Sequence, residues 1–308
     1  MHALVVGADG FAGRWLTQHL LEAGDSVDAL VGPRFVPPLA GVETVERTDV
    51  RDLPTLSRFV LRSQPDAIYY LAGVSHQGGR DVFPAAVGVS VIGCMNTLVA
   101  ASGLVQPPRF LFVSTGLVYR EADHPVREED PTLPNGLYAM AKLVGEEALR
   151  RLAPPSDVEV LIARAFNHIG PGQREPFIVP NIANQIAEVV RGRSDTIRVR
   201  SVSPVRDFTD VRDVVRAYRL LATRADPGSI HNIASGSGIS IGELIETMLN
   251  IAGISAMVEA SGAEDEGPQA VIGDASKIKG LGWEAEYPLR RTLEDVLSDR
   301  RDQAPIAP

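Results

Sequence analysis

The sequence predicts an α/β protein with a Rossmann-type, doubly wound parallel sheet and a smaller carboxy-terminal α/β domain. Apolar runs of strand length alternate with amphipathic helical segments through the first half of the chain. These runs are too apolar for a sheet with one face in water, so helices are expected on both faces. The glycine-rich segment GADGFAG directly follows the first run and opens a helix, as the first turn of such a sheet does.

The first half provides most of the expected sheet. Runs of aliphatic and aromatic residues predict strands at 3–6, 26–31, 42–45, 67–73, 110–115 and 158–167. Helical periodicity between them predicts helices at 13–24, 53–65, 84–103 and 137–152. In the first helix Trp15, Leu16, Leu20 and Leu21 share one face, and Gly24 is a stop signal.

The second half is mixed. Helices are expected at 176–192, 210–222, 240–253 and after 289, and short strands at 196–200 and 229–235. Ser240 is expected to cap its helix. We therefore expect a dinucleotide-binding Rossmann domain over 1–166, with 205–235 returning to it. The substrate-binding domain is then formed by 167–204 and 236–308.

Composition excludes several classes of function. The 308 residues carry a net charge of −9, which argues against nucleic acid or an anionic membrane as a partner. Cys94 is the single cysteine, so an internal disulfide is impossible and no metal site is expected. The opening MHALVVGADG has too short an apolar run for a signal peptide or a membrane span, so we expect a cytoplasmic protein.

Three glycines at intervals of three, Gly7, Gly10 and Gly13, predict a phosphate-binding turn. Such a turn lets backbone N–H groups and a helix N-terminus approach a pyrophosphate. The spacing is G-x-x-G-x-x-G rather than G-x-G-x-x-G, and a merely tight βα turn is the alternative. The residues expected at the cofactor are Gly7, Gly10, Phe11, Gly13, Arg34, Asp49, Val50, Leu71, Ala72, Gly73, Tyr138 and Lys142.

The end of the second strand favours NADP over NAD. An acid that would bind the adenosine ribose is absent near Val31, and Arg34 follows closely. A guanidinium suits a 2′-phosphate, although Arg34 could simply be a solvated loop residue. Asp49, after the next strand, could accept a hydrogen bond from the adenine amino group.

Tyr138 and Lys142 are four residues apart on an expected helix, so their side chains leave the same face. An ammonium beside a phenol favours the phenolate and brings its pKa towards the working range. Such a pair also occurs by chance on protein surfaces. Thr115 ends a strand 23 residues earlier and supplies a hydroxyl, which favours a catalytic set of Thr115, Tyr138 and Lys142.

These motifs resemble those of extended short-chain dehydrogenases/reductases that act on nucleotide sugars. The resemblance covers nearly the whole chain through GADGFAG, LAG, VSTGLVY, YAMAK, RAFNHIGPGQ and VRDFTDVRD. The last two are similar to GDP-6-deoxy-4-keto-D-mannose reductases, which form GDP-D-rhamnose. The resemblance implies NADP or NAD as cofactor, and a homodimer built on helices near 84–103 and 137–152. It also implies a nucleotide-diphosphate sugar substrate bound by Ser75, Thr115, Asn167 and Arg206.

The sequence departs from the family pattern at three positions. Ser90 replaces an asparagine, although Asn96 keeps the second one of that helix. Glu264 stands near an expected nucleotide-binding arginine, which weakens the inference of GDP, and Ala165 replaces a proline. His168 is as consistent with orienting its loop as with contacting substrate.

Several reactions remain open. Reduction of a C4 ketone on a nucleotide-linked 4-keto-6-deoxyhexose fits best. A 4-epimerase would prefer an acid at the second strand end, and a reductase could also form the C4 epimer or use a dTDP- or UDP-sugar. A dehydratase needs acids directly after Thr115, where Gly116 and Leu117 stand. A non-catalytic nucleotide-binding protein would usually lack the tyrosine or the lysine. The loops 74–84 and 262–271 are expected to set substrate identity.

Overall fold

A sheet of seven parallel strands forms the centre of the computed structural model, which describes residues 1–33, 39–74, 83–154, 157–262 and 270–302. The strands lie in the order β10-β6-β5-β4-β1-β2-β3, which confirms the predicted Rossmann-type sheet. They are β1 (His2–Val6), β2 (Ser26–Val31), β3 (Thr44–Arg47), β4 (Ala67–Tyr70), β5 (Arg109–Thr115), β6 (Glu159–Ala165) and β10 (Ile230–Ile233).

Helices cover both faces of this sheet, because successive strand residues point to opposite faces and both sets are apolar. Ala3 and Val5 pack towards α1 (Phe11–Glu22) and α7 (Val211–Arg224). Leu4 and Val6 lie in the core on the other face. The helices on that face are α2 (Leu53–Ser63), α4 (Cys94–Ser102) and α5 (Gly136–Leu152).

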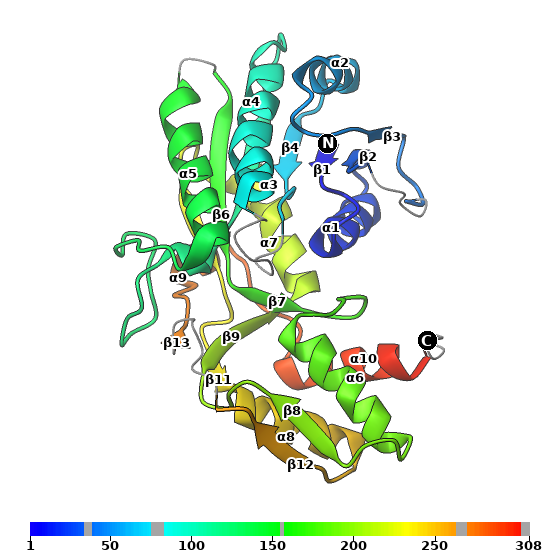
Figure 1. The fold of residues 1–308 in the computed structure, drawn as a ribbon. Helices are drawn as coiled ribbons and strands as arrows, with labels where there is room; N and C mark the ends of the chain where they lie inside the picture. Colours follow the sequence, from blue (N-terminus) through cyan, green and yellow to red (C-terminus); the bar gives the residue numbers. More distant parts are fainter. Residues whose placement is uncertain (34–38, 75–82, 155–156, 263–269, 303–308) are drawn as a thin grey trace.

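The direction of the winding reverses between β1 and β4 (Figure 1). The chain runs outward from β1 to β3 and then returns to add β4, β5 and β6 on the other side of β1. In open α/β sheets, ligands bind outside the carboxyl ends of the strands at this reversal. The fold therefore places the expected cofactor site beside the residues that follow β1 and β4.

A second layer follows β6, drawn below the large sheet in Figure 1. Strand β9 (Val205–Asp210) pairs with β7 (Asn167–Ile169), β11 (Gly238–Ser240) and β13 (Ala270–Val271). A separate pair joins β8 (Thr196–Val199) to β12 (Met257–Ala260). The helices of this half are α6 (Ile178–Val190), α8 (Ile241–Ala252), α9 (Ser276–Gly280) and α10 (Leu289–Asp302).

The second half also shows where sequence patterns were insufficient. Strands β9, β11, β12 and β13 and helix α9 were not predicted, because four of these five elements have five residues or fewer. Within 205–235, α7 and β10 return to the large sheet as expected, whereas β9 pairs in the smaller one. The domain boundaries remain a prediction. The cap on α8 is confirmed, because Ser240 and Glu243 form a capping box.

The predicted helix at 84–103 contains an unpredicted π-helical segment. It consists of α3 (Phe83–Val87), the π segment η2 (Gly88–Gly93) and α4. The Tyr70 hydroxyl donates to the Val89 carbonyl oxygen at 2.6 Å, so a buried tyrosine fills the irregular turn. By length and composition alone, Phe83–Ser102 could cross a membrane, and among the described residues it is the one such candidate.

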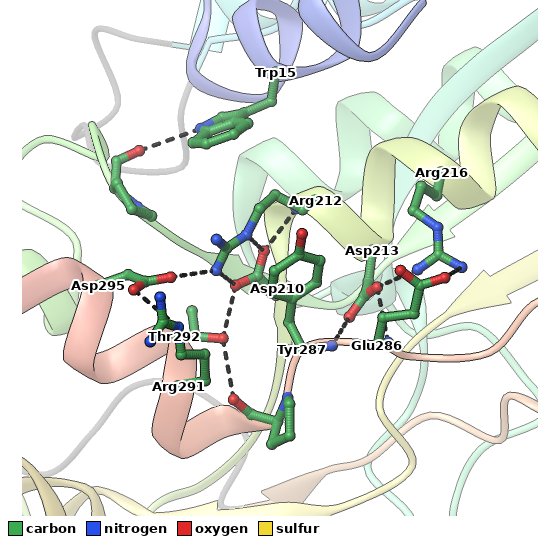
Figure 2. A network of polar contacts seen from close by, with 12 residues as sticks. Trp15, Asp210, Arg212, Asp213, Arg216, Glu286, Tyr287, Arg291, Thr292 and Asp295 are labelled. Carbon is green, nitrogen blue, oxygen red and sulfur yellow. Dashed lines mark hydrogen bonds and ion pairs between the residues drawn. The ribbon is translucent and has the colours of Figure 1, made fainter. Parts of the chain in front are cut away.

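Buried acids join α7 to the chain that precedes α10 (Figure 2). The Asp213 carboxylate accepts hydrogen bonds from the backbone N–H groups of Glu286 and Tyr287, both at 3.0 Å. It also pairs with Arg216 at 2.6 Å. Asp210 caps α7 and accepts from the Thr292 hydroxyl at 2.7 Å. This cluster fixes α10 to the helix that packs on the large sheet.

Asp213→Ala should reduce the free energy of unfolding by about 2–4 kcal/mol, because it removes the acceptor of two part-buried N–H groups and one of the two carboxylates that pair with Arg216. Urea denaturation followed by circular dichroism measures the loss. Glu147→Ala, which breaks only exposed ion pairs on α5, is the control and should change stability by less than about 1 kcal/mol. Equal stability of the two variants would contradict this role for Asp213.

Candidate active site

The turn between β1 and α1 brings backbone close to backbone. Gly7 has a φ of +90°, and a Cβ there would lie 2.7 Å from the Ala72 nitrogen. A Cβ on Gly13 would lie 2.2 Å from the Gly7 carbonyl oxygen. No side chain caps α1, whose N-cap is Gly10. The first-turn N–H groups are thus left for an anion, as a pyrophosphate-binding turn requires.

The loop after β3 is held by α4. The Asn96 side-chain amide donates to the carbonyl oxygens of Val50 and Arg51, each at 3.1 Å. The Asp49 carboxylate pairs with Arg51 at 2.6 Å, and these hydrogen bonds keep the pKa of Asp49 below its usual value. Asn96 therefore acts on this loop through backbone contacts, which fixes the segment where adenine was expected.

Lys142 lies buried at the carboxyl ends of β4 and β5. Its Nζ donates to the Val113 carbonyl oxygen at 2.8 Å and lies 3.5 Å from that of Ala72. The ammonium also sits 4.9 Å from the centre of the Phe112 ring. Burial lowers the pKa of Lys142 to about 8, while Cys94 and Glu146 oppose the shift. The Lys142 ammonium is thus a buried hydrogen-bond donor close to Ala72, on which the turn with Gly7 packs.

Thr115 and Tyr138 both precede this lysine, Thr115 on β5 and Tyr138 on the same helix as Lys142. Thr115 ends β5, is buried, and accepts a hydrogen bond from the Leu117 N–H at 3.2 Å through its hydroxyl oxygen. Tyr138 lies half-buried in the first turn of α5, one turn before Lys142. Burial raises the pKa of Tyr138 to about 12. The expected lowering by Lys142 is therefore wrong for this structure, since the ammonium is directed at backbone carbonyls.

Two of the expected substrate residues, Asn167 and Arg206, lie on β7 and β9. The Asn167 amide donates to the Asp207 carbonyl oxygen at 3.4 Å, and Arg206 precedes Asp207 on the paired strand. The His168 ring lies parallel to that of Phe11, with centroids 6.0 Å apart, and its Nδ1 is 3.2 Å from the Phe166 carbonyl oxygen. His168 thus connects the glycine turn to β7 and has the backbone bond of a loop-orienting residue.

Comparison with known proteins decides the family. Residues 3–234 match the NAD dependent epimerase/dehydratase family. The chain belongs to this family. It is an NAD(P)-dependent oxidoreductase of the extended short-chain dehydrogenase/reductase type.

Relatives within the NAD dependent epimerase/dehydratase family catalyse different reactions. The chain is 31% identical to GDP-6-deoxy-D-mannose reductase of Pseudomonas aeruginosa, covering 96% of this chain and 95% of the relative. It is 27% identical to a UDP-glucose 4-epimerase of Streptomyces lividans, covering 91% and 90%. A solved structure of RMD from Pseudomonas aeruginosa complexed with NADPH has a TM-score of 0.84 and 30% identity, covering 98% of this chain and 99% of that chain.

The residues present fit the dinucleotide of this family. Gly7 and Gly13 leave no room for side chains beneath the turn, and a Cβ on Gly73 would lie 3.3 Å from the Lys142 ammonium. Leu71 donates its N–H to the Val6 carbonyl oxygen at 2.9 Å, which holds the end of β4 against β1. The predicted cofactor residues that follow β1 and those that follow β4 therefore lie together at the carboxyl ends of these strands. Arg34 and Ser75 lie outside the described residues, and so does Glu264.

Sequence patterns missed four buried residues that organise this edge. Glu146 on α5 and Arg164 on β6 form a buried ion pair between the helix and the sheet. The Asp207 carboxylate accepts from the N–H groups of Ser235, Gly236 and Gly273 and joins three segments below Asn167. The fourth is Asn232, which accepts from the Tyr119 hydroxyl at 2.6 Å. These residues bond partners that are distant in sequence, so local patterns do not reveal the contacts. Two of the residues do stand within motifs, Asp207 in VRDF and Arg164 in RAFN.

Gly13→Ala should weaken NADPH binding about tenfold or more, because its Cβ forces α1 away from the turn and displaces the N–H groups. Titration of nucleotide fluorescence measures the affinity. Gly280→Ala on α9, where a Cβ would meet nothing within 4 Å, is the matched control and should bind normally. Normal binding by both variants would contradict the assigned turn.

Proposed function

We propose that this enzyme reduces the C4 ketone of a nucleotide-linked 4-keto-6-deoxyhexose, converting GDP-4-dehydro-6-deoxy-D-mannose to GDP-D-rhamnose. The observation that carries the proposal is the set of Thr115, Tyr138 and Lys142 with no acid directly after Thr115, where Gly116 and Leu117 stand. Gly116 directly follows Thr115, and a Cβ there would lie 3.0 Å from the Phe166 ring. The position after Thr115 is therefore closed to an acid, and elimination of water lacks its acid–base group.

The chemistry divides between cofactor and protein. The bound dinucleotide supplies the hydride for the ketone carbon. Tyr138 is neutral at physiological pH, because burial raises its pKa to about 12, so it holds the proton that a forming alkoxide needs. We assign the Thr115 hydroxyl to the same sugar oxygen. Lys142 is assigned to the nicotinamide ribose, to which its buried ammonium can donate a hydrogen bond.

The substrate and cofactor assignments rest on the relatives and on the sequence. The GDP-6-deoxy-D-mannose reductase of Pseudomonas aeruginosa and the RMD structure complexed with NADPH support a GDP-sugar and NADPH. Asn167 and Arg206 are assigned to the sugar nucleotide. Asn167 is on the unit that 167–204 and 236–308 would form, and Arg206 is on the neighbouring strand β9, at the start of 205–235. The unit of 1–166 and 205–235 would hold the cofactor, with Arg34 at the 2′-phosphate and Asp49 at the adenine.

Epimerisation at C4 is the second candidate, favoured by the 27% identity to a UDP-glucose 4-epimerase. The two reactions differ in how the enzyme treats its cofactor. A reductase consumes added NADPH in proportion to product. An epimerase retains tightly bound NAD, so protein purified with oxidised NAD and active without added cofactor would replace the proposal.

We also propose a homodimer of a cytoplasmic enzyme, joined through α4 and α5. Apolar residues at helical spacing are 38–55% exposed on η2, α4 and α5: Ile92, Val99, Leu137, Met140 and Val144. Figure 1 shows the two helices side by side on one flank of the molecule. A second copy would cover both stripes, which accounts for the half-exposed apolar helix at 83–102 without a membrane.

Tyr138→Phe should lower turnover of GDP-4-dehydro-6-deoxy-D-mannose by about 10²–10⁴-fold, because it removes only the proton donor. NADPH oxidation at 340 nm and chromatography of the product measure turnover, while NADPH affinity should stay normal. Tyr119→Phe is the matched control, since that hydroxyl bonds Asn232 rather than the site, and should keep most activity. Near-normal turnover by Tyr138→Phe would contradict the proposal.

The double variant Val99→Glu/Val144→Glu should convert a dimer into a monomer, because it places charges within both apolar stripes. Sedimentation velocity measures the change in mass. Val190→Glu on α6, at a site of similar exposure, should leave the dimer intact. A monomeric wild type, or a dimeric double variant, would refute this interface.

A further inference from the structure

A buried ion pair joins helix α5, which holds Tyr138 and Lys142, to strand β6. Glu146 on α5 and Arg164 on β6 have side chains 1% and 5% exposed, and Arg164 Nη2 lies 2.7 Å from Glu146 Oε2. The Arg164 Nε adds contacts of 3.2 and 3.1 Å to the two carboxylate oxygens. Burial of both charges costs as much as their attraction returns, so stability alone is a weak reason for the pair.

The remaining polar contacts of the pair connect the segments around α5. The Ser114 hydroxyl donates to Glu146 Oε1 from β5. Arg164 Nη1 donates to the Glu128 carbonyl oxygen at 3.3 Å, and its guanidinium lies 4.8 Å from the centre of the Tyr119 ring. One carboxylate is therefore fixed from two neighbouring strands at once.

Glu146 lies on the same face of α5 as Tyr138 and Lys142. Glu146 follows Lys142 by four residues and Tyr138 by eight, which places all three along one face of α5. Its partner Ser114 immediately precedes Thr115. The helix and the strand that hold the catalytic residues are thus joined at a single buried point.

We propose that Glu146, held by Arg164 and Ser114, is a positioning residue that locks α5 to β5 and places a buried negative charge one helical turn from the Lys142 ammonium. The proposal rests on the proposed function only in treating Lys142 as the residue that meets the cofactor.

The charged surroundings of Lys142 make the proposal specific. The titratable groups whose charges act on it are Cys94 on α4 and Glu146 on α5, and β6 brings Arg164 against Glu146. Tyr138 precedes Lys142 by one turn of α5. Burial raises the pKa of the Cys94 thiol to about 12, so it stays neutral near pH 8. Glu146 is then the one full negative charge of this set. Without it, the pKa of Lys142 falls further, because desolvation is opposed less.

Glu146→Gln tests the proposal through the pH dependence of NADPH binding, measured by nucleotide fluorescence from pH 6.5 to 9. Wild-type affinity should decline as pH rises through about 8, where Lys142 loses its proton. In the variant the decline should move to lower pH, so that affinity at pH 8 falls about fivefold while affinity at pH 6.5 changes less than about twofold. Glu146→Asp keeps the charge and should restore the wild-type profile.

Asp25→Asn is the matched control. It breaks an ion pair whose acid is also buried, Asp25 Oδ2 with Arg219 at 2.7 Å, at the amino end of β2 and away from the carboxyl edge of the sheet, and should leave the profile unchanged. A Glu146→Gln profile that keeps its wild-type midpoint would overturn the proposal. If Glu146→Gln does not fold, Ser114→Ala takes its place. That variant should lower turnover at least about threefold at unchanged NADPH affinity, and undiminished turnover would equally overturn it.

The NADPH-binding outcomes are separate from the proposed reaction, and the Ser114→Ala measurement applies once wild-type turnover of the proposed ketone substrate is established. NADPH binding reports on Lys142 whether or not the GDP-sugar is the substrate. Failure of the wild type to reduce that ketone would refute the proposed function and leave the binding test intact.

Discussion

Burial of the Lys142 ammonium at the carboxyl edge of the sheet is the constraint on which the rest of the site depends. A cation taken out of water costs several kcal/mol unless hydrogen bonds replace its hydration. Here the carbonyl oxygens of Val113 and Ala72 provide those bonds. Both belong to the ends of β5 and β4, so the lysine can be satisfied only where these strands end. The glycine turn after β1 meets the same place, because Gly7 packs on Ala72.

The site also needs polar residues that hold its helices and loops in place without contacting the catalytic groups. Glu146 and Arg164 hold α5 from behind, and Asn96 fixes the loop after β3. The Asp207 carboxylate accepts hydrogen bonds from the N–H groups of Ser235 and Gly273, which fixes these two loops to β9. Reactive geometry has to be held within fractions of an ångström, and buried hydrogen-bonded groups do this better than apolar packing, which tolerates sliding. The catalytic residues are few, and their support is distributed over most of the fold.

Sequence predicted the features whose signal is local. The spacing of Gly7, Gly10 and Gly13 and the i, i+4 relation of Tyr138 and Lys142 each lie within one turn or helix, and the structure places them at the same sheet edge. The π segment at 88–93, the short strands around β9 and the Glu146–Arg164 pair depend on distant partners, which local patterns cannot reveal. The pKa of Tyr138 was predicted in the wrong direction, because burial cannot be read from spacing. The acids of VRDFTDVRD belong to this nonlocal part, since Asp207, Asp210 and Asp213 all bond distant backbone or side chains.

Transfer of the label from deuterated NADPH tests the central claim most directly. The enzyme is supplied with GDP-4-dehydro-6-deoxy-D-mannose and NADPH that carries deuterium at the transferable position of the nicotinamide. The account predicts one deuterium at C4 of GDP-D-rhamnose for each NADPH oxidised, seen by NMR and mass spectrometry. Absence of NADPH oxidation and of deuterium at C4 with this ketone would contradict it. Cofactor-neutral inversion at C4 of a 4-hydroxy nucleotide sugar such as UDP-glucose would instead identify an epimerase.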